Sequence, residues 1–380
     1  MKEFESLALM PTRNSFEVAT DVPNSLKHKT LGTAFLIIVF SLSLVLAMAP
    51  SAHSSDPGNR EWFLALEYGI FVDMQIVNTD AVTIYAAAAA GGILKSADGG
   101  ASWEMPRSGL TNRNVNTIAV DPLHPTTVYA GTTGSGVFKS TDAGSTWLQV
   151  KQGLANLNVH ALVVDPKNSS TVYAGTFGGG VYKSTDGGSN WAPSHDGITD
   201  LHITLLAIDP KNSNLLYAGT HDGGLFKSSD GGAHWTLCSP ALNKSKVRAL
   251  AIDANNSSTL FLGSWNEGIL KSTDGGSTWT PCNGGLKEKS ICALAVDPRD
   301  GSVVYAGTCS SGVFMSSDGC KSWISFNDGL TNTKIRSLAV NPKSPEILYA
   351  GTYRGGIFIT TEKKPAKQTA DKPSATEGHI

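Results

Sequence analysis

The octapeptide SADGGASW at residues 96–103 recurs five more times, and the spacing of its copies decides the fold. Each copy follows the one before it by 44 residues, without insertion or deletion, and keeps the pattern Ser-x-Asp-x-Gly/Cys-x-x-Trp. A fixed period of this length predicts one supersecondary unit repeated along the chain. The other copies are STDAGSTW (140–147), STDGGSNW (184–191), SSDGGAHW (228–235), STDGGSTW (272–279) and SSDGCKSW (316–323).

The segments between the copies have the composition of β-strands. In one unit NTIAVDP (116–122) is followed by TVYAGT (127–132) and GVFKS (136–140), and related runs occur in the other units. Short runs rich in β-branched and aromatic residues, bounded by Gly, Asp, Asn and Pro, predict strands. Four short strands in a period of about 40–45 residues are typical of a β-propeller blade. Counting the second strand gives seven units, at Tyr85, Tyr129, Tyr173, Tyr217, Phe261, Tyr305 and Tyr349.

The seventh unit lacks an outermost strand, and an N-terminal segment can supply it. The tail KKPAKQTADKPSATEGHI (363–380) is rich in Lys and Pro, which predicts disorder. Residues 61–67, EWFLALE, read as a spare strand, so we expect Trp62–Glu67 to complete blade seven. Such closure removes the exposed sheet edges of an open array. The predicted fold is therefore all-β, a single seven-bladed propeller over residues 56–362.

Residues 1–55 carry a targeting pattern. Leu31–Ala49 is a run of 19 residues without a charge, and Lys27, His28 and Lys29 precede it. This arrangement is typical of a secretory signal with a long n-region. A run of about 17–25 apolar residues is also long enough for a retained transmembrane anchor, so both alternatives stay open. In either case we expect the chain after Ala49 to be extracytoplasmic, periplasmic or secreted, and any membrane contact to run through residues 31–49.

Composition and motifs exclude several classes of function. The chain has 30 basic and 32 acidic residues, which argues against a nucleic-acid-binding surface. It contains no phosphate loop, nucleophile elbow or zinc motif, so neither a cofactor nor a metal is predicted. We expect a monomer. The odd number of cysteines leaves at least one thiol unpaired, and we expect small buried or rim thiols at Cys238, Cys282, Cys292, Cys309 and Cys320.

The six copies resemble the Asp-box (BNR) repeat, over about residues 61–362. That repeat marks sialidases, xyloglucanase-type glycoside hydrolases, sortilin-type receptor domains and Ycf48-type photosystem II assembly factors. The resemblance implies a propeller with the box in an outer hairpin, away from the ligand face. It implies no single function, because enzymes and non-enzymes share the box.

The box residues have a structural explanation. An Asp side chain can accept backbone N–H bonds within a tight turn, glycines tolerate positive φ, and Trp buries a large apolar surface. We therefore predict structural roles for the aspartates Asp98, Asp142, Asp186, Asp230, Asp274 and Asp318 and for the tryptophans Trp103, Trp147, Trp191, Trp235, Trp279 and Trp323.

Positions that differ between units are free to carry function. In a propeller, the loops between second and third strands lie on one face with the blade-to-blade connections, around the channel mouth. Aromatic rings and charges on such a face suit a sugar, a peptide or a protein loop. The alternative is solvated loop tips without a ligand. The predicted ligand-binding residues are Phe177, His221, Trp265, Tyr353, Arg248, Arg336 and Arg354.

Catalysis has one candidate pair. Asp222 and Glu267, on the adjacent blades four and five, are the only carboxylates in these loops, and they could act as acid and base on a glycosidic bond if about 5–9.5 Å apart. The arginines resemble the sialidase cluster that grips a carboxylate, but no Phe-Arg-Ile-Pro motif is present and the loops carry no insertions. We therefore favour an exported, non-catalytic, Ycf48-like binding or assembly scaffold with a protein or carbohydrate partner. The alternative is a glycoside hydrolase or a sugar-binding propeller.

Overall fold

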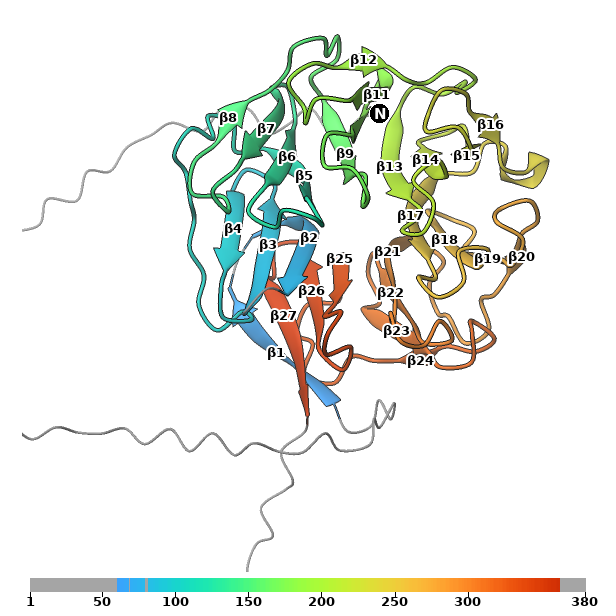
Figure 1. The fold of residues 1–380 in the computed structure, drawn as a ribbon. Helices are drawn as coiled ribbons and strands as arrows, with labels where there is room; N and C mark the ends of the chain where they lie inside the picture. Colours follow the sequence, from blue (N-terminus) through green and yellow to red (C-terminus); the bar gives the residue numbers. More distant parts are fainter. Residues whose placement is uncertain (1–59, 68, 79–80, 363–380) are drawn as a thin grey trace, which may run out of the picture. The chain divides into compact units, whose positions relative to one another are not determined.

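Seven antiparallel sheets form a ring of blades in the computed structural model, which describes residues 60–67, 69–78 and 81–362 (Figure 1). The predicted all-β, seven-bladed propeller is confirmed. The targeting segment 1–55 and the tail 363–380 lie outside the described residues. Within the described residues, no helix is long and apolar enough to cross a membrane.

Each blade begins with an innermost strand beside the central channel and extends outward to the rim. The innermost strands of blades one to seven are β2 (Phe71–Asn78), β5 (Val115–Val120), β9 (Val159–Val164), β13 (Ile203–Ile208), β17 (Val247–Ile252), β21 (Ile291–Val296) and β25 (Ile335–Val340). The second strands are β3 (Val82–Ala88), β6 (Val128–Thr132), β10 (Val172–Thr176), β14 (Leu216–Thr220), β18 (Leu260–Ser264), β22 (Val304–Thr308) and β26 (Leu348–Thr352).

The third strands contain four to six residues, and the outer strands contain two, except for the closing strand. They are β4 (Gly92–Ser96), β7 (Gly136–Ser140), β11 (Gly180–Ser184), β15 (Leu225–Ser228), β19 (Ile269–Ser272), β23 (Val313–Ser316) and β27 (Ile357–Glu362). The outer strands are β8 (Leu148–Gln149), β12 (Ala192–Pro193), β16 (Thr236–Leu237), β20 (Thr280–Pro281), β24 (Ile324–Ser325) and the closing strand β1 (Arg60–Leu66). A short 3₁₀ helix, η2 (Pro240–Leu242), precedes blade five.

The second strands form the core, because neighbouring blades cover both of their faces. Every residue of β6 is buried. Gly131 in β6 lets the next blade approach closely, since a Cβ there would lie 2.6 Å from Val159 Cγ1. Tyr129 in the same strand spans the interface and donates its hydroxyl to the Gly187 carbonyl of the following blade, at 3.0 Å. The repeated Tyr-Ala-Gly-Thr run therefore sets how adjacent blades pack.

Strand β1 closes the ring as predicted, although it begins two residues earlier, at Arg60. It pairs antiparallel with β27, from Arg60 opposite Glu362 to Leu66 opposite Ile357. Trp62 is only 3% exposed, and its Nε1 donates to the Phe326 carbonyl of blade six at 2.8 Å. The N-terminal strand thus joins the first and last parts of the propeller.

Arg60 also replaces a cation that blade six lacks. In blades two to five a third-strand lysine donates to a box carbonyl of the next blade, as Lys139 does to Gly187 at 2.8 Å. Blade six has Met315 at that position. The buried Arg60 guanidinium reaches the same interface, where it donates to the Tyr305 hydroxyl at 3.3 Å.

Blade one departs from the predicted four strands, because its sheet contains only β2, β3 and β4. Glu104 forms an isolated bridge with Lys95, and no outer strand follows. In blade two the backbone N–H of Val150 continues the pairing by donating to Val137 at 2.8 Å. Pro106 stands at the equivalent position of blade one and has no N–H to donate.

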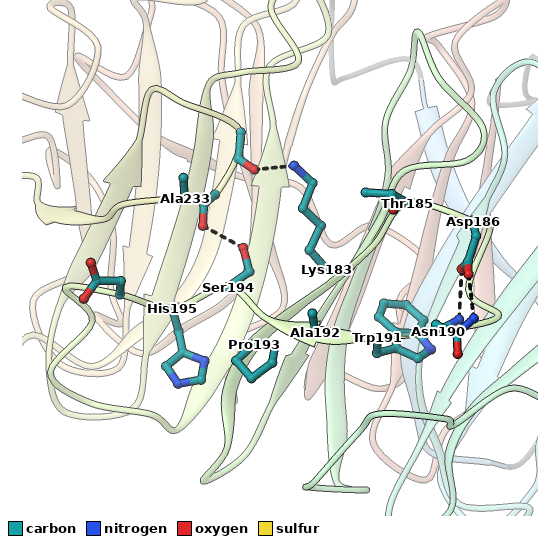
Figure 2. A pocket seen from close by; sticks show the side chains of 13 residues that line it. Lys183, Thr185, Asp186, Asn190, Trp191, Ala192, Pro193, Ser194, His195 and Ala233 are labelled. Atoms are coloured by element: carbon teal, nitrogen blue, oxygen red, sulfur yellow. Dashed lines mark hydrogen bonds between the residues drawn. The ribbon is translucent and has the colours of Figure 1, made fainter.

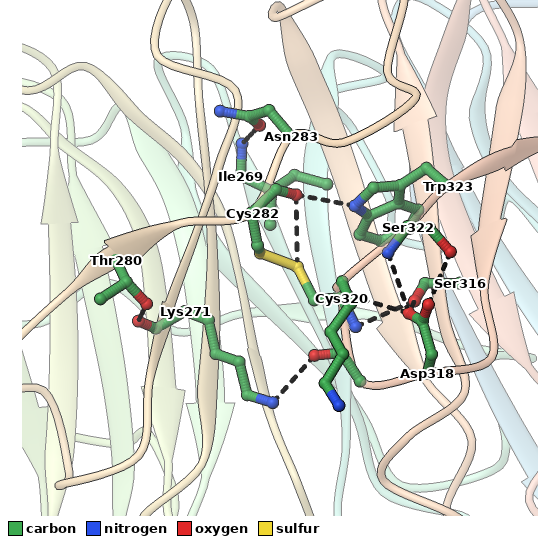
Figure 3. The surroundings of a disulfide bond; sticks show 12 residues. Ile269, Lys271, Thr280, Cys282, Asn283, Ser316, Asp318, Cys320, Ser322 and Trp323 are labelled. Carbon is green, nitrogen blue, oxygen red and sulfur yellow. Dashed lines mark hydrogen bonds between the residues drawn. A yellow bond between two sulfur atoms is a disulfide. The ribbon is translucent and has the colours of Figure 1, made fainter.

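The prediction of free thiols is wrong for four of the five cysteines. Cys282–Cys320 and Cys292–Cys309 are disulfides, whereas Cys238 is free, so the predicted unpaired thiol is confirmed. The Cys282–Cys320 disulfide joins the end of blade five to the box of blade six (Figure 3). Trp323 donates from Nε1 to the Cys282 carbonyl beside it, at 2.8 Å.

Candidate functional site at the channel mouth

A β-bulge lies near the start of every innermost strand. In β5 the register shifts between Val115 and Thr117, which leaves Asn116 without a partner on β6. Bulges re-aim side chains and are frequent next to functional sites. The same shift in each blade places one residue per blade on the face of the loops between second and third strands: Val72, Asn116, His160, Thr204, Arg248, Cys292 and Arg336.

In five blades the bulged residue contacts the residue that follows the second strand, 17 positions later. We call these contacts the mouth pairs. The five pairs use four kinds of contact, so the backbone geometry is constant while the side chains at the mouth vary. The pairs are Asn116–Thr133 (hydrogen bond, 2.9 Å), His160–Phe177 (stacked rings, 5.1 Å), Arg248–Trp265 (cation over ring, 4.5 Å), Cys292–Cys309 (disulfide) and Arg336–Tyr353 (cation over ring, 5.2 Å).

Blades three and four contribute an aromatic and histidine cluster. The Phe177 ring stacks on His160 and meets the edges of His202 at 4.7 Å and His221 at 5.6 Å. Burial and the nearby Arg248 lower the pKa of His160 below the usual histidine value. Phe177 and His221, both predicted from the sequence, therefore lie together. His202, which lies on the connection between the two blades, was not predicted from the sequence.

Blades five and seven contribute the arginines. Arg248 lies over Trp265, while Arg336 and Arg354 lie over Tyr353, each at 5.2 Å. Among the described residues none of these three guanidinium groups pairs with a carboxylate. Burial and the neighbouring Arg336 lower the pKa of Arg248, so two like charges lie within electrostatic reach. A guanidinium held flat on a ring keeps its N–H edges available for an anion.

The two carboxylates proposed for catalysis each have partners, chiefly on the connection between blades four and five. Asp222 is exposed and pairs with Lys246 at 3.5 Å and His221 at 3.7 Å. Glu267 is half-buried and accepts a hydrogen bond from the Ser245 hydroxyl at 2.9 Å. These contacts anchor the loops, and the catalytic role stays a hypothesis.

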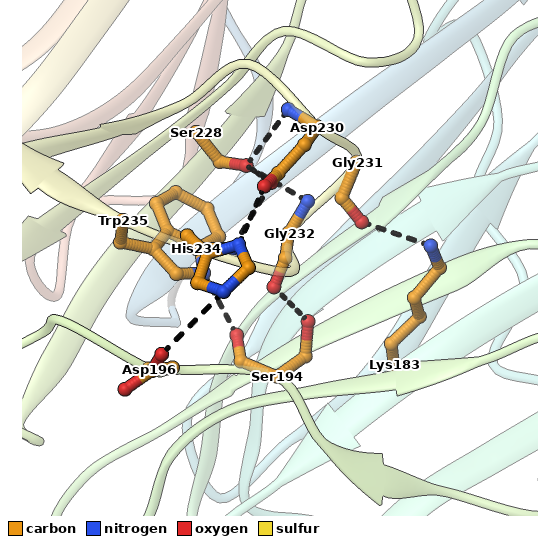
Figure 4. Close-up of polar contacts among 9 residues, drawn as sticks. All are labelled: Lys183, Ser194, Asp196, Ser228, Asp230, Gly231, Gly232, His234 and Trp235. Carbon is orange, nitrogen blue, oxygen red and sulfur yellow. Dashed lines mark hydrogen bonds and ion pairs between the residues drawn. The ribbon is translucent and has the colours of Figure 1, made fainter.

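The box carboxylates are occupied within their turns, on the face opposite the mouth. Oδ1 of Asp186 accepts from the Asn190 backbone at 2.9 Å, and Oδ2 accepts from the Asn190 side chain at 2.8 Å. These bonds hold the pKa of Asp186 at about 2. In blade four His234 takes the donor position, binding Asp230 at 2.8 Å and lying 3.8 Å from Asp196 (Figure 4). The geometry accounts for the box without a ligand.

A cavity of about 420 Å³ opens at the rim between blades three and four (Figure 2). Its polar groups already bridge the blades: Lys183 donates to the Gly231 carbonyl at 2.8 Å, and Ser194 donates to Gly232 at 2.6 Å. Trp191, on its wall, is only 5% exposed and offers no open ring face. The mouth is therefore the stronger candidate. Across residues 60–67, 69–78 and 81–362, no cluster of three or more His, Cys, Asp or Glu side chains could hold a metal ion.

Comparison with known proteins supports the fold. No family model and no curated protein matches the chain. Among solved structures, the Niastella koreensis GH74 enzyme is 22% identical, with a TM-score of 0.66 over 78% of this chain and 53% of the enzyme. YCF48 bound to D1 peptide is 15% identical, with a TM-score of 0.63 over 82% of this chain and 99% of YCF48.

An extracellular domain from B. thetaiotaomicron, that of BT4673, is also similar: it is 15% identical, with a TM-score of 0.62 over 79% of this chain and 39% of that chain. This chain spans about half the length of the GH74 enzymes it matches. The predicted resemblance to xyloglucanase-type and Ycf48-type propellers is confirmed. At these identities the likeness establishes the fold alone.

Proposed function

We propose that this chain is an exported, non-catalytic binding or assembly scaffold that recognises an anionic protein segment at its channel mouth. The main observation is the set of three arginines, Arg248, Arg336 and Arg354, which lie over aromatic rings and have no carboxylate partner in the part of the chain that the structure describes. Aligned guanidinium groups bind carboxylates through charge-assisted, often bidentate, hydrogen bonds. The rings beside them supply apolar contact for the rest of the segment.

Other features fit this proposal. The matching structure of similar length, YCF48, is a protein bound to a peptide, whereas the GH74 enzymes are about twice as long as the matched region. The two disulfides fit an extracytoplasmic location, because such bonds persist in oxidising compartments. Asp222 and Glu267 are engaged with neighbouring side chains, which suits a rigid binding face.

Fluorescence anisotropy with rhodamine-labelled hexa-aspartate, against hexa-asparagine, tests the proposal. The protein should bind the acidic peptide selectively and more weakly as salt rises. Changing Arg248, Arg336 and Arg354 together to Ala should abolish binding. A matched control changes Lys167, Lys211 and Arg299 to Ala, because these three cations cap backbone carbonyls on the opposite face.

Equal binding of both peptides, or an equal loss in both triple variants, would overturn the proposal. A polysaccharide-hydrolysis screen gives the competing outcome. Hydrolysis that disappears in Asp222→Asn or Glu267→Gln would replace the scaffold function with that of a glycoside hydrolase.

A further inference from the structure

We propose that an anion bound at the channel mouth drives proton uptake by His160, so that acidification strengthens binding. This inference rests on the proposed function and adds its regulation by pH. It is carried by the position of His160, which lies on the same ring of bulges as Arg248 and Arg336 and has no acidic partner among the described residues.

The imidazole of His160 is held in place by packing. It lies on the bulge of β9, half-buried, and stacks on Phe177 with 26° between the ring planes. His202 and His221 press on Phe177 from other directions. Among the described residues the His160 imidazole makes no hydrogen bond or ion pair. Its nitrogen atoms are therefore available to a ligand.

Around this cluster the acidic groups have basic partners, whereas the arginines of the mouth have no acidic ones within the described part of the chain. His202 is tied to Asp200 at 2.8 Å, and His221 lies 3.7 Å from Asp222. Asp222 also pairs with Lys246, so both acidic groups of the neighbouring connections are satisfied. Farther round the ring of bulges, β17 carries Arg248, which acts on His160 electrostatically, and β25 carries Arg336, which acts on Arg248. The two innermost strands packed against β9 are β5 and β13, and their bulged residues are the neutral Asn116 and Thr204.

This environment disfavours the protonated form of His160 as long as no anion is bound at the mouth. Burial and Arg248 lower the pKa of His160 in the free protein. A carboxylate seated at Arg248 would cancel the repulsion and add an attraction, which raises the pKa of the imidazole. If one proton is taken up on binding, affinity rises up to tenfold for each unit by which the pH falls. This holds between the pKa of His160 in the bound protein and its lower pKa in the free protein.

Hexa-aspartate titrations at pH 5.5, 6.5 and 7.5 and constant ionic strength test the coupling, because the peptide's carboxylates stay largely ionised there. We expect affinity to rise several-fold from pH 7.5 to 5.5. His160→Asn should flatten this dependence, and blade two already carries Asn116 at the equivalent bulge. His234→Asn is the matched control, because His234 lies in a box on the opposite face. NMR should show the pKa of His160 rising when the peptide is added.

Three results would overturn the inference. Equal affinity at all three pH values would remove the pH coupling and leave the scaffold function standing. A pH dependence that persists in His160→Asn would assign the proton to another group. Absence of binding at every pH would overturn the scaffold proposal together with this one.

Discussion

Replacing Trp62 by Ala should open the ring between blades six and seven. The side chain is 3% exposed, its ring centroid lies 5.7 Å from that of Phe326, and its Nε1 donates to the Phe326 carbonyl. Truncating a buried Trp costs about 3–5 kcal/mol, and the abandoned carbonyl adds about 1 kcal/mol. We therefore expect a loss of about 4–6 kcal/mol in the free energy of unfolding.

Urea unfolding followed by circular dichroism measures this loss. Phe63→Ala is the matched control, because Phe63 is the next residue of β1 and is 42% exposed. It should cost about 1–2 kcal/mol, because nearly half of its surface is already in water. Trp62→Phe should fall between them, because it keeps most of the packing and loses the hydrogen bond. Equal shifts of the unfolding midpoint for Trp62→Ala and Phe63→Ala would refute the role of β1 in closure.

Other predictions concern the disulfides and the boxes. Gly276→Cys should form a disulfide with Cys238, because a Cβ at residue 276 would lie 3.5 Å from the Cys238 Sγ. A cysteine fits this backbone, since Cys320 occupies the same box position with φ +80°. The number of titratable thiols should fall from one to none, and a count of two would contradict the prediction. Changing Cys292 and Cys309 to Ser opens a crosslink of 17 residues and should cost about 3 kcal/mol in urea without loss of the blades; an unfolded variant would contradict this. The box aspartates whose pKa falls from 3.8 to about 2 stabilise the fold above pH 3.8 and lose that contribution as pH falls toward 2. Acid unfolding followed by tryptophan fluorescence should therefore begin below about pH 4, and unfolding at pH 5 would argue against it.

The sequence predicted the architecture because every level of it repeats. The box, the Tyr-Ala-Gly-Thr strand and the period of 44 residues agree with one another, and only the break at Pro106 was missed. Variation between units also pointed to the mouth, since residues such as Arg248 and Trp265 stand where other blades have small polar groups. Local turn chemistry and strand alternation were sufficient for these predictions.

The mouth pairs were not predicted, because bulges leave no clear signal in strand composition. The register itself contained that information: residues 17 apart, such as Asn116 and Thr133, meet in one blade after another. Applied to blade six, the same offset joins Cys292 to Cys309. The approach of Arg248 to Arg336 depends on how blades five and seven curve around the channel, which no local pattern specifies.

The pairing of Arg60 with Glu362 has a consequence for how this protein can be attached to anything else. Both ends of the described propeller leave blade seven at the side of the box turns, whereas the mouth pairs occupy the other side. A membrane anchor, a fused domain or an affinity surface joined to either end would therefore be attached on the side of the box turns. The arginines and histidines of the mouth would then lie on the opposite side and stay accessible to a ligand in solution.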